Sequence, residues 1–258
     1  KFILKAYKLE PKEYKLNDHQ LIVPELPIIN LTDSRYFTNS NLTKLLLFNF
    51  MGSDNNLEPY CYNTMVEQAN LVQKNKDNYE ITIISLVDRS SYNDYNDDTR
   101  IWNDSNYFND PINDKAFDIY ICHTQTNHKW SKFRLGNTEE VLNIMKTKHD
   151  SATTKIEVLD LFLILILENL KNEEKNNPNI ALSLNIWDHG VFYGISVDHA
   201  TKDKILYMNE IHNTIKTNLE KYNIQKLDYL QFECCLTTSI FNIKLFSDVA
   251  LYFIGATT

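Results

Sequence analysis

Short apolar runs alternate with amphipathic segments along most of the chain. Apolar runs with the length and composition of buried strands lie at 45–50, 80–87, 180–187 and 227–235. Segments with apolar residues on one helical face lie at 57–73, 137–149, 156–173 and 205–222. This alternation of strands and helices predicts an α/β domain with a mainly parallel sheet.

Weaker patterns complete the expected domain. Residues 116–125 and 129–135 predict a β-hairpin, residues 191–200 a short hairpin or loop, residues 237–246 a helix and residues 249–255 a strand. Residues 1–43 contain three prolines and no sustained periodicity, so we expect an extended lead-in that lies on a domain at 44–258.

The composition limits the class of protein. The 258 residues carry 26 Lys and Arg against 34 Asp and Glu, a net charge of -8. This argues against nucleic acid as a partner, because phosphate backbones are bound by clustered cations. No membrane span is expected, because the longest apolar run, at 161–167, is far shorter than the roughly 20 residues a spanning helix needs. No secretory segment is visible after Lys1, so the localisation stays open between secreted and cytoplasmic.

We expect no cofactor. The four cysteines lack CxxC spacing and the density of a disulfide scaffold, which argues against a structural zinc site. The Asp- and Asn-rich segment at 93–98 offers oxygen ligands for calcium. However, it lacks the central Gly and the terminal Glu of an EF-hand loop, so a solvated insertion is favoured. His123 and His128 are expected to be exposed, and we do not assign them as ligands.

Two strand-like runs end in residues that carry chemistry. The run at 180–187 is followed by His189, and the run at 227–235 ends on Cys235. An open α/β sheet presents its site at the carboxyl ends of its strands. The helical segment between the two runs fits a right-handed crossover that makes them neighbours. His189 and Cys235 are therefore candidates for the base and the nucleophile of a dyad.

Four segments in order resemble the clostripain-like (C11) cysteine peptidases of clan CD. They are Asp-Asn-Asn-Leu-Glu at 54–58, Asp-Arg at 88–89, Trp-Asp-His-Gly at 187–190 and Glu-Cys-Cys-Leu at 233–236, where the family has Asp-Ala-Cys-Leu. The resemblance covers roughly residues 44–258. It implies a three-layer caspase-like fold, with a mainly parallel central sheet flanked by helices, whose C-terminal part continues beyond Thr258.

The residues and the resemblance together predict a thiol protease. Cys235 would attack the scissile carbonyl, His189 would protonate the leaving amine, and the amides of Gly190 and Cys235 would bind the oxyanion. The predicted helix at 237–246 would place its N-terminal amides beside the sulfur. Alternation along the strand puts Glu233 on the face of Cys235 and turns Cys234 toward the core.

Glu233 points to the substrate class. A carboxylate repels a nearby thiolate, which is tolerated if the substrate brings a cation. Glu233 would then line the pocket for Arg or Lys before the scissile bond, as the resemblance also implies. The expected partner is a protein or peptide substrate with a basic residue at the cleavage site.

Other interpretations stay open. Residues 191–193, Val-Phe-Tyr, stand where the family has further glycines, which fits a catalytically silent relative that binds proteins. A thioredoxin-like redox protein is a weaker alternative, because Cys234 and Cys235 are adjacent and face opposite sides. Family members are commonly activated by internal cleavage after a basic residue. Lys202 and Lys204 are candidate self-cleavage sites in an exposed polar stretch, with a solvated turn as the alternative.

Overall fold

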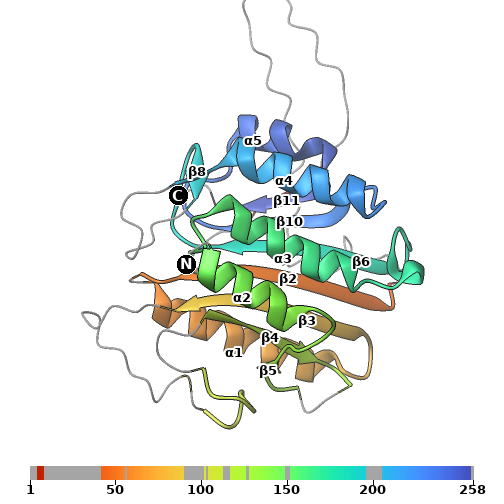
Figure 1. The fold of residues 1–258 in the computed structure, drawn as a ribbon. Coiled ribbons are helices and arrows are strands. Elements are labelled where there is room, and N and C mark those ends of the chain that lie inside the picture. The colour runs from red at the N-terminus through yellow and green to blue at the C-terminus, as the bar shows by residue number, and fades with distance from the viewer. Residues whose placement is uncertain are drawn as a thin grey trace, which may run out of the picture.

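The protein is built around one central sheet (Figure 1). The computed structural model describes residues 5–8, 42–55, 57–89, 102, 104–112, 117–125, 128–148, 152–195 and 205–256. Within these ranges the sheet has eight strands in the order β1-β11-β10-β6-β2-β3-β4-β5. Their bounds are β1 Lys5–Lys8, β2 Lys44–Ser53, β3 Glu80–Arg89, β4 Phe117–His123, β5 Ser131–Lys132, β6 Ile180–Trp187, β10 Leu227–Glu233 and β11 Ala250–Gly255.

The centre of the sheet is parallel. Strands β3, β2, β6, β10 and β11 pair in parallel register, whereas β1, β4 and β5 pair antiparallel with their neighbours. The predicted mainly parallel sheet and the predicted pairing of 116–125 with 129–135 are both confirmed. Strand β1 lies at the sheet edge beside β11, and most of the lead-in at 1–43 lies outside the described residues.

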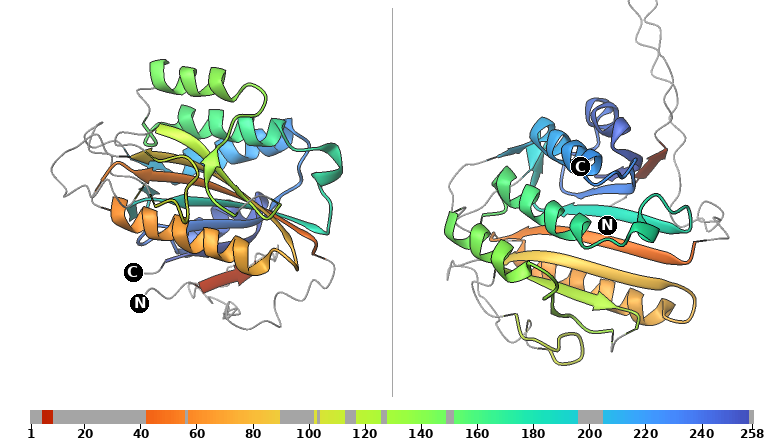
Figure 2. Two further views of the ribbon diagram at one scale, coloured as in Figure 1. Left: turned by 90° about the horizontal axis from the view of Figure 1, so that it is seen from below. Right: turned by 45° about the vertical axis from the view of Figure 1, so that its right-hand side comes forward.

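Helices cover both faces of the sheet and give three layers (Figure 2). Helix α1 (Glu58–Asn75) lies on one face, and α2 (Thr138–Lys148), α3 (Ile156–Glu168) and α4 (Met208–Lys221) lie on the other. Helix α3 is apolar almost all round because it lies between the sheet, α2 and α4. No helix in the described part of the chain is long and apolar enough to cross a membrane.

The predicted short hairpin follows β6, whereas α4 and α5 begin later than the sequence predicts. A small second sheet follows β6, with β7 (Gly190–Val191), β8 (Gly194–Ile195) and β9 (Leu206–Tyr207). Because β9 pairs with β8, α4 begins at Met208 and not at residue 205. Helix α5 (Ile240–Leu245) begins three residues later than predicted, because the Ser239 hydroxyl caps it by accepting from the Asn242 amide at 3.1 Å.

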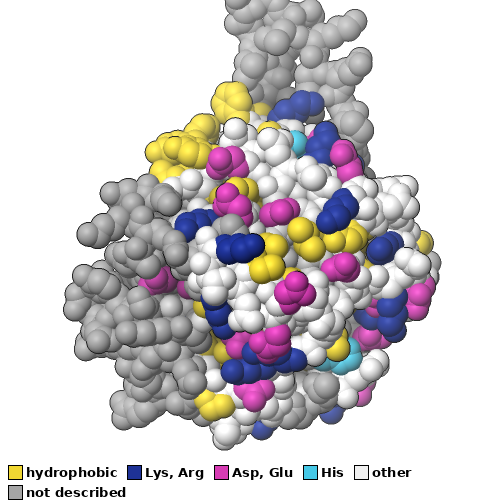
Figure 3. Space-filling model, viewed as in Figure 1, with side chains coloured by type: hydrophobic (Ala, Val, Ile, Leu, Met, Phe, Trp, Pro, Cys, Tyr) yellow, Lys and Arg dark blue, Asp and Glu magenta, His cyan; other side chains and the backbone are white. Residues whose placement is uncertain are grey.

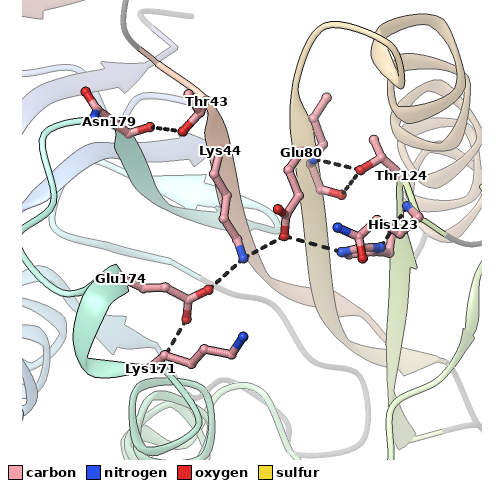
Figure 4. Close-up of polar contacts among 10 residues, drawn as sticks. Thr43, Lys44, Glu80, His123, Thr124, Lys171, Glu174 and Asn179 are labelled. Atoms are coloured by element: carbon pink, nitrogen blue, oxygen red, sulfur yellow. Dashed lines mark hydrogen bonds and ion pairs between the residues drawn. The ribbon is translucent and has the colours of Figure 1, made fainter.

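A cluster of charged side chains lies at the amino-terminal ends of β2 and β3 (Figure 4). Lys44 Nζ lies 2.7 Å from Glu80 Oε1 on β3 and 2.6 Å from Glu174 Oε1 in the 3-10 turn η3 (Asn172–Glu174). His123 Nε2 lies 3.7 Å from Glu80 Oε1. The prediction that His123 and His128 are exposed is wrong, since both are half-buried. For His123 the cause is its position at the end of β4, beside the start of β3.

Candidate active site

The segments that carry His189 and Cys235 leave the sheet side by side. Strands β6 and β10 are parallel neighbours, and Trp187 lies opposite Glu233. A side-chain carbon on Gly190 would lie 3.0 Å from the amide nitrogen of Cys235 and closer still to its carbonyl oxygen. The backbone after His189 therefore touches the backbone of Cys235. The predicted neighbouring of the two strands is confirmed.

The four cysteines, all within the described ranges, differ sharply in exposure. Cys61, Cys122 and Cys234 are buried, and Cys235 alone is exposed. Burial raises the pKa of Cys61 and of Cys122 to about 12 and that of Cys234 well above its ordinary value. The Cys234 thiol donates to the Ile186 carbonyl at 3.3 Å, so the expected core position of Cys234 is confirmed. Cys235 is thus the one of these four thiols that is open to solvent.

A tight turn follows Cys235. Leu236 has a φ of 56°, a left-handed conformation that is uncommon for residues other than glycine. The Thr237 hydroxyl donates to the Cys234 carbonyl at 3.0 Å and stabilises the turn. Because α5 begins only at Ile240, the predicted helix N-terminus beside the sulfur is wrong. The turn, not a helix, directs the backbone at Cys235.

Asp188 holds the main chain before the imidazole. Its Oδ1 accepts from the backbone N–H of His189 at 2.5 Å and from Asn55 Nδ2 at 2.9 Å. Its Oδ2 lies over Gly52, where an added side-chain carbon would be only 2.5 Å away. The buried Asp188 carboxylate thus fixes the backbone of His189, which is itself half-buried.

The two other motif segments, 54–58 and 88–89, lie at the same carboxyl ends of the parallel strands. Asn55 also accepts from the Leu57 amide at 2.9 Å, which turns the chain into α1. The first residue of α1, Glu58, pairs with Arg89 at 2.5 Å. The residue types in these two motifs do not by themselves predict a contact with the site. Their order along the chain was the available signal, because each one ends a parallel strand.

Asp88 links this edge to the layer of α3. Its Oδ2 accepts from both the amide and the hydroxyl of Thr153, each at 3.1 Å. Thr153 lies three residues before α3, in a segment without any motif, so the sequence carried no signal for it. The contact anchors the loop before α3 to the end of β3.

Glu233 lies on the face of the sheet that α1 covers. Its ladder neighbour Trp187 packs in the core beneath α1, and Gln231 Nε2 donates to Glu233 Oε1 at 2.6 Å. Burial raises the pKa of Glu233 and the charge of Glu67 adds to this, while hydrogen bonds from Asn185 and Gln231 oppose it. A cation bound at this carboxylate would relieve the cost of keeping it ionised.

Two further sequence predictions concern metal binding and self-cleavage. The described residues contain no group of three His, Cys, Asp or Glu side chains that could hold a metal ion. The calcium candidate at 93–98 and the self-cleavage candidates Lys202 and Lys204 lie outside the described residues, so they stay predictions.

The fold is that of C11 cysteine proteases. No protein-family model and no curated protein matches the sequence. Two solved structures of a secreted C11 cysteine protease from Bacteroides thetaiotaomicron are similar, one in complex with an irreversible peptide inhibitor and one called iotapain. Each has a TM-score of 0.51 and covers 84% of this chain, at 12% and 16% identity. The chain spans 49% and 53% of their lengths. The three-layer caspase-like fold is confirmed.

Proposed function

We propose that this chain is a clostripain-like cysteine endopeptidase that cleaves proteins or peptides after Arg or Lys with a Cys235–His189 dyad. One observation carries the proposal. The only exposed cysteine among the four, all of them described, follows one parallel strand, and its backbone touches the segment that carries His189 after the next strand. The two similar solved structures are of a C11 cysteine protease, which supports the same class of chemistry.

The reaction follows ordinary thiol protease chemistry. His189 takes the proton of the Cys235 thiol, and the thiolate attacks the scissile carbonyl carbon. The backbone amides of Gly190 and Cys235 donate to the oxyanion that forms. As the C–N bond breaks, the imidazolium of His189 gives its proton to the leaving amine. Water, activated by His189, then hydrolyses the thioester and restores the thiol.

Glu233 supplies the specificity in this proposal. Its carboxylate is half-buried and has a raised pKa because of burial, so an unpaired charge there is unfavourable. The guanidinium of Arg or the ammonium of Lys compensates that charge, whereas a neutral side chain leaves it unpaired. Discrimination by a buried charge of this kind costs the wrong substrate a few kcal/mol, on the order of 2–5.

A matched pair of cysteine variants tests the proposal. Cys235→Ala should lower cleavage of a fluorogenic arginyl peptide by roughly 10³-fold or more, because the nucleophile is lost. Cys234→Ala, one residue away and buried, should keep the wild-type kcat/KM. Equal losses in the two variants would contradict the assignment. The alternative, a catalytically silent relative, predicts that the wild-type protein cleaves no peptide with a basic residue. It also predicts that an arginyl acyloxymethylketone does not modify Cys235.

A further inference from the structure

Large apolar side chains are exposed together beside the candidate active site. They come from the β7–β8 turn, from β9, from the turn after Cys235 and from the first two residues of α5. They are Phe192, Tyr193, Tyr207, Leu236, Ile240 and Phe241, with exposed fractions from 44% to 71%. We call these six residues the aromatic rim. Figure 3 shows hydrophobic side chains gathered at its upper left, over β8 and α5 as Figure 1 labels them.

The rim is held in a fixed arrangement. The rings of Phe192 and Phe241 meet edge to face with their centroids 6.2 Å apart. Asn242 Nδ2 donates to the Phe192 carbonyl at 3.2 Å and ties the hairpin to α5. The rings of Tyr193 and Tyr207 stack at 6.2 Å. Ordered rings lose little conformational entropy when a ligand binds them.

Scattered exposed apolar residues are common, but a contiguous group of them marks an interaction site. Eleven large hydrophobic residues are exposed in the described part of the chain, and six of them form the rim. The two segments that supply most of the rim, 190–195 and 234–243, contain no charged residue. The chemistry of the rim therefore fits an apolar side chain and does not fit a polyanion.

The rim is continuous with the candidate nucleophile. Leu236 directly follows Cys235, and Phe192 is two residues after Gly190, which touches the Cys235 backbone. An extended peptide advances about 3.3 Å per residue, so a chain bound at Cys235 reaches the rim within a few residues. A peptide substrate is for this reason the occupant that the position favours.

We infer that the aromatic rim binds a bulky apolar side chain of the peptide substrate, within about three residues of the scissile bond. This inference rests on the proposed function and refines it. The preferred cleavage sequence has a basic residue for Glu233 and an aromatic or aliphatic residue for the rim. The aromatic rim and the Glu233 carboxylate together then select substrates that carry both an apolar and a basic side chain.

A scanning set of peptides tests the inference. Internally quenched peptides carry one Arg, and a Phe is moved through three positions on each side of the cleavage site in an otherwise Ala and Ser background. At one position or more, Phe should raise kcat/KM about tenfold over Ala, the size expected for an apolar subsite. In Phe241→Ser the ratio of kcat/KM for the Phe peptide to kcat/KM for the Ala peptide should fall toward one. Tyr79→Ser, which removes an exposed aromatic residue before β3, should keep the ratio of the wild type.

Other outcomes overturn the inference in distinguishable ways. If arginyl peptides are cleaved at one rate wherever Phe stands, the rim is not a subsite, while the proposed function stands. If the wild type cleaves none of the peptides and an arginyl acyloxymethylketone does not modify Cys235, the proposed function itself fails. If sedimentation shows a dimer that Phe241→Ser dissociates, and the peptide ratio is unchanged, the rim binds a second copy and the inference is wrong.

Discussion

A side-chain carbon on Gly190 would lie 2.3 Å from the carbonyl oxygen of Cys235 and 2.7 Å from the β-carbon of Cys234. Both distances are far inside van der Waals contact, and one of the two atoms belongs to the backbone. The segments after β6 and β10 can approach this closely because residue 190 has no side chain. This contact brings the imidazole segment to the thiol.

Gly190→Ala should therefore lower the activity strongly. The new methyl group must push the two segments apart, and a shift of about 1 Å at reacting groups costs on the order of 10²-fold in rate. The overpacking should also cost about 1–3 kcal/mol of the free energy of unfolding. Fluorogenic peptide kinetics and urea unfolding measure both effects.

Gly136→Ala is the matched control for that variant. Gly136 has a φ of 57° and lies between β5 and α2, so alanine there is strained but distant from the thiol. This change should cost about 1 kcal/mol of stability and keep the wild-type kcat/KM. A Gly190→Ala protein with wild-type kcat/KM would contradict the contact as the basis of the site.

Asn55→Ala should slow the reaction without weakening substrate binding. Asn55 donates to Asp188, whose carboxylate holds the His189 backbone. Losing this buried hydrogen bond should cost about 1–3 kcal/mol of stability. We expect kcat to fall about tenfold and KM to change less than about twofold, the pattern of a positioning residue.

A second Asn variant separates positioning from general destabilisation. Asn218 Nδ2 on α4 donates to Asp160 Oδ1 at 2.7 Å, a similar amide–carboxylate contact away from the site. Asn218→Ala should lower stability and leave kcat unchanged. Equal falls in kcat for the two variants would show that Asn55 acts through stability alone.

Glu233→Gln should change stability and specificity in opposite directions. Burial raises the pKa of Glu233, so its contribution to stability is full at low pH and is lost as the pH rises through the folded-state pKa. The variant should thus gain stability over the wild type at pH 7, and the gain should vanish toward pH 4. It should also lose preference for arginyl peptides. Melting temperatures at both pH values test the first part, and an equal difference at pH 4 and pH 7 would refute it.

His123 should make the amino-terminal edge sensitive to acid. Burial lowers the pKa of His123 below 6.5, although Glu80 opposes the shift. Because the folded state prefers the neutral ring, stability is lost as the pH falls below 6.5. His123→Gln cannot be protonated in this range, so it should lose less stability than the wild type between pH 7 and pH 5.5. Urea unfolding at the two pH values checks this, and parallel losses would show that folding does not lower the pKa of His123.

Much of the fold could be predicted from local pattern. The run at 180–187 coincides with β6, because a strand buried on both faces is continuously apolar and bounded by polar residues. The pairing of β6 with β10 followed from the crossover rule, which needs only the helix between them. The sequence alone therefore predicts that His189 and Cys235 lie at the same end of the sheet.

The polar contacts that position the site could not be predicted from the sequence in the same way. Asn55 and Asp188 are 133 residues apart, and no periodicity links them. The start of α5 depended on capping by Ser239, and the half-burial of His123 on its position at the end of β4, beside the start of β3. A contact between distant segments, a local cap and a strand pairing determine these features, whereas hydrophobic patterns report only strands and helices.

The central claim is that Cys235 is a nucleophile activated by His189 and aimed at a basic substrate. Its most direct test is mass spectrometry of the protein after reaction, under reducing conditions, with an arginyl acyloxymethylketone, whose carboxylate leaves as the thiolate forms a thioether. The other three cysteines are buried, so the account predicts one adduct, on Cys235, that is lost in His189→Ala. An unmodified Cys235, or equal labelling in the His189→Ala protein, would contradict it.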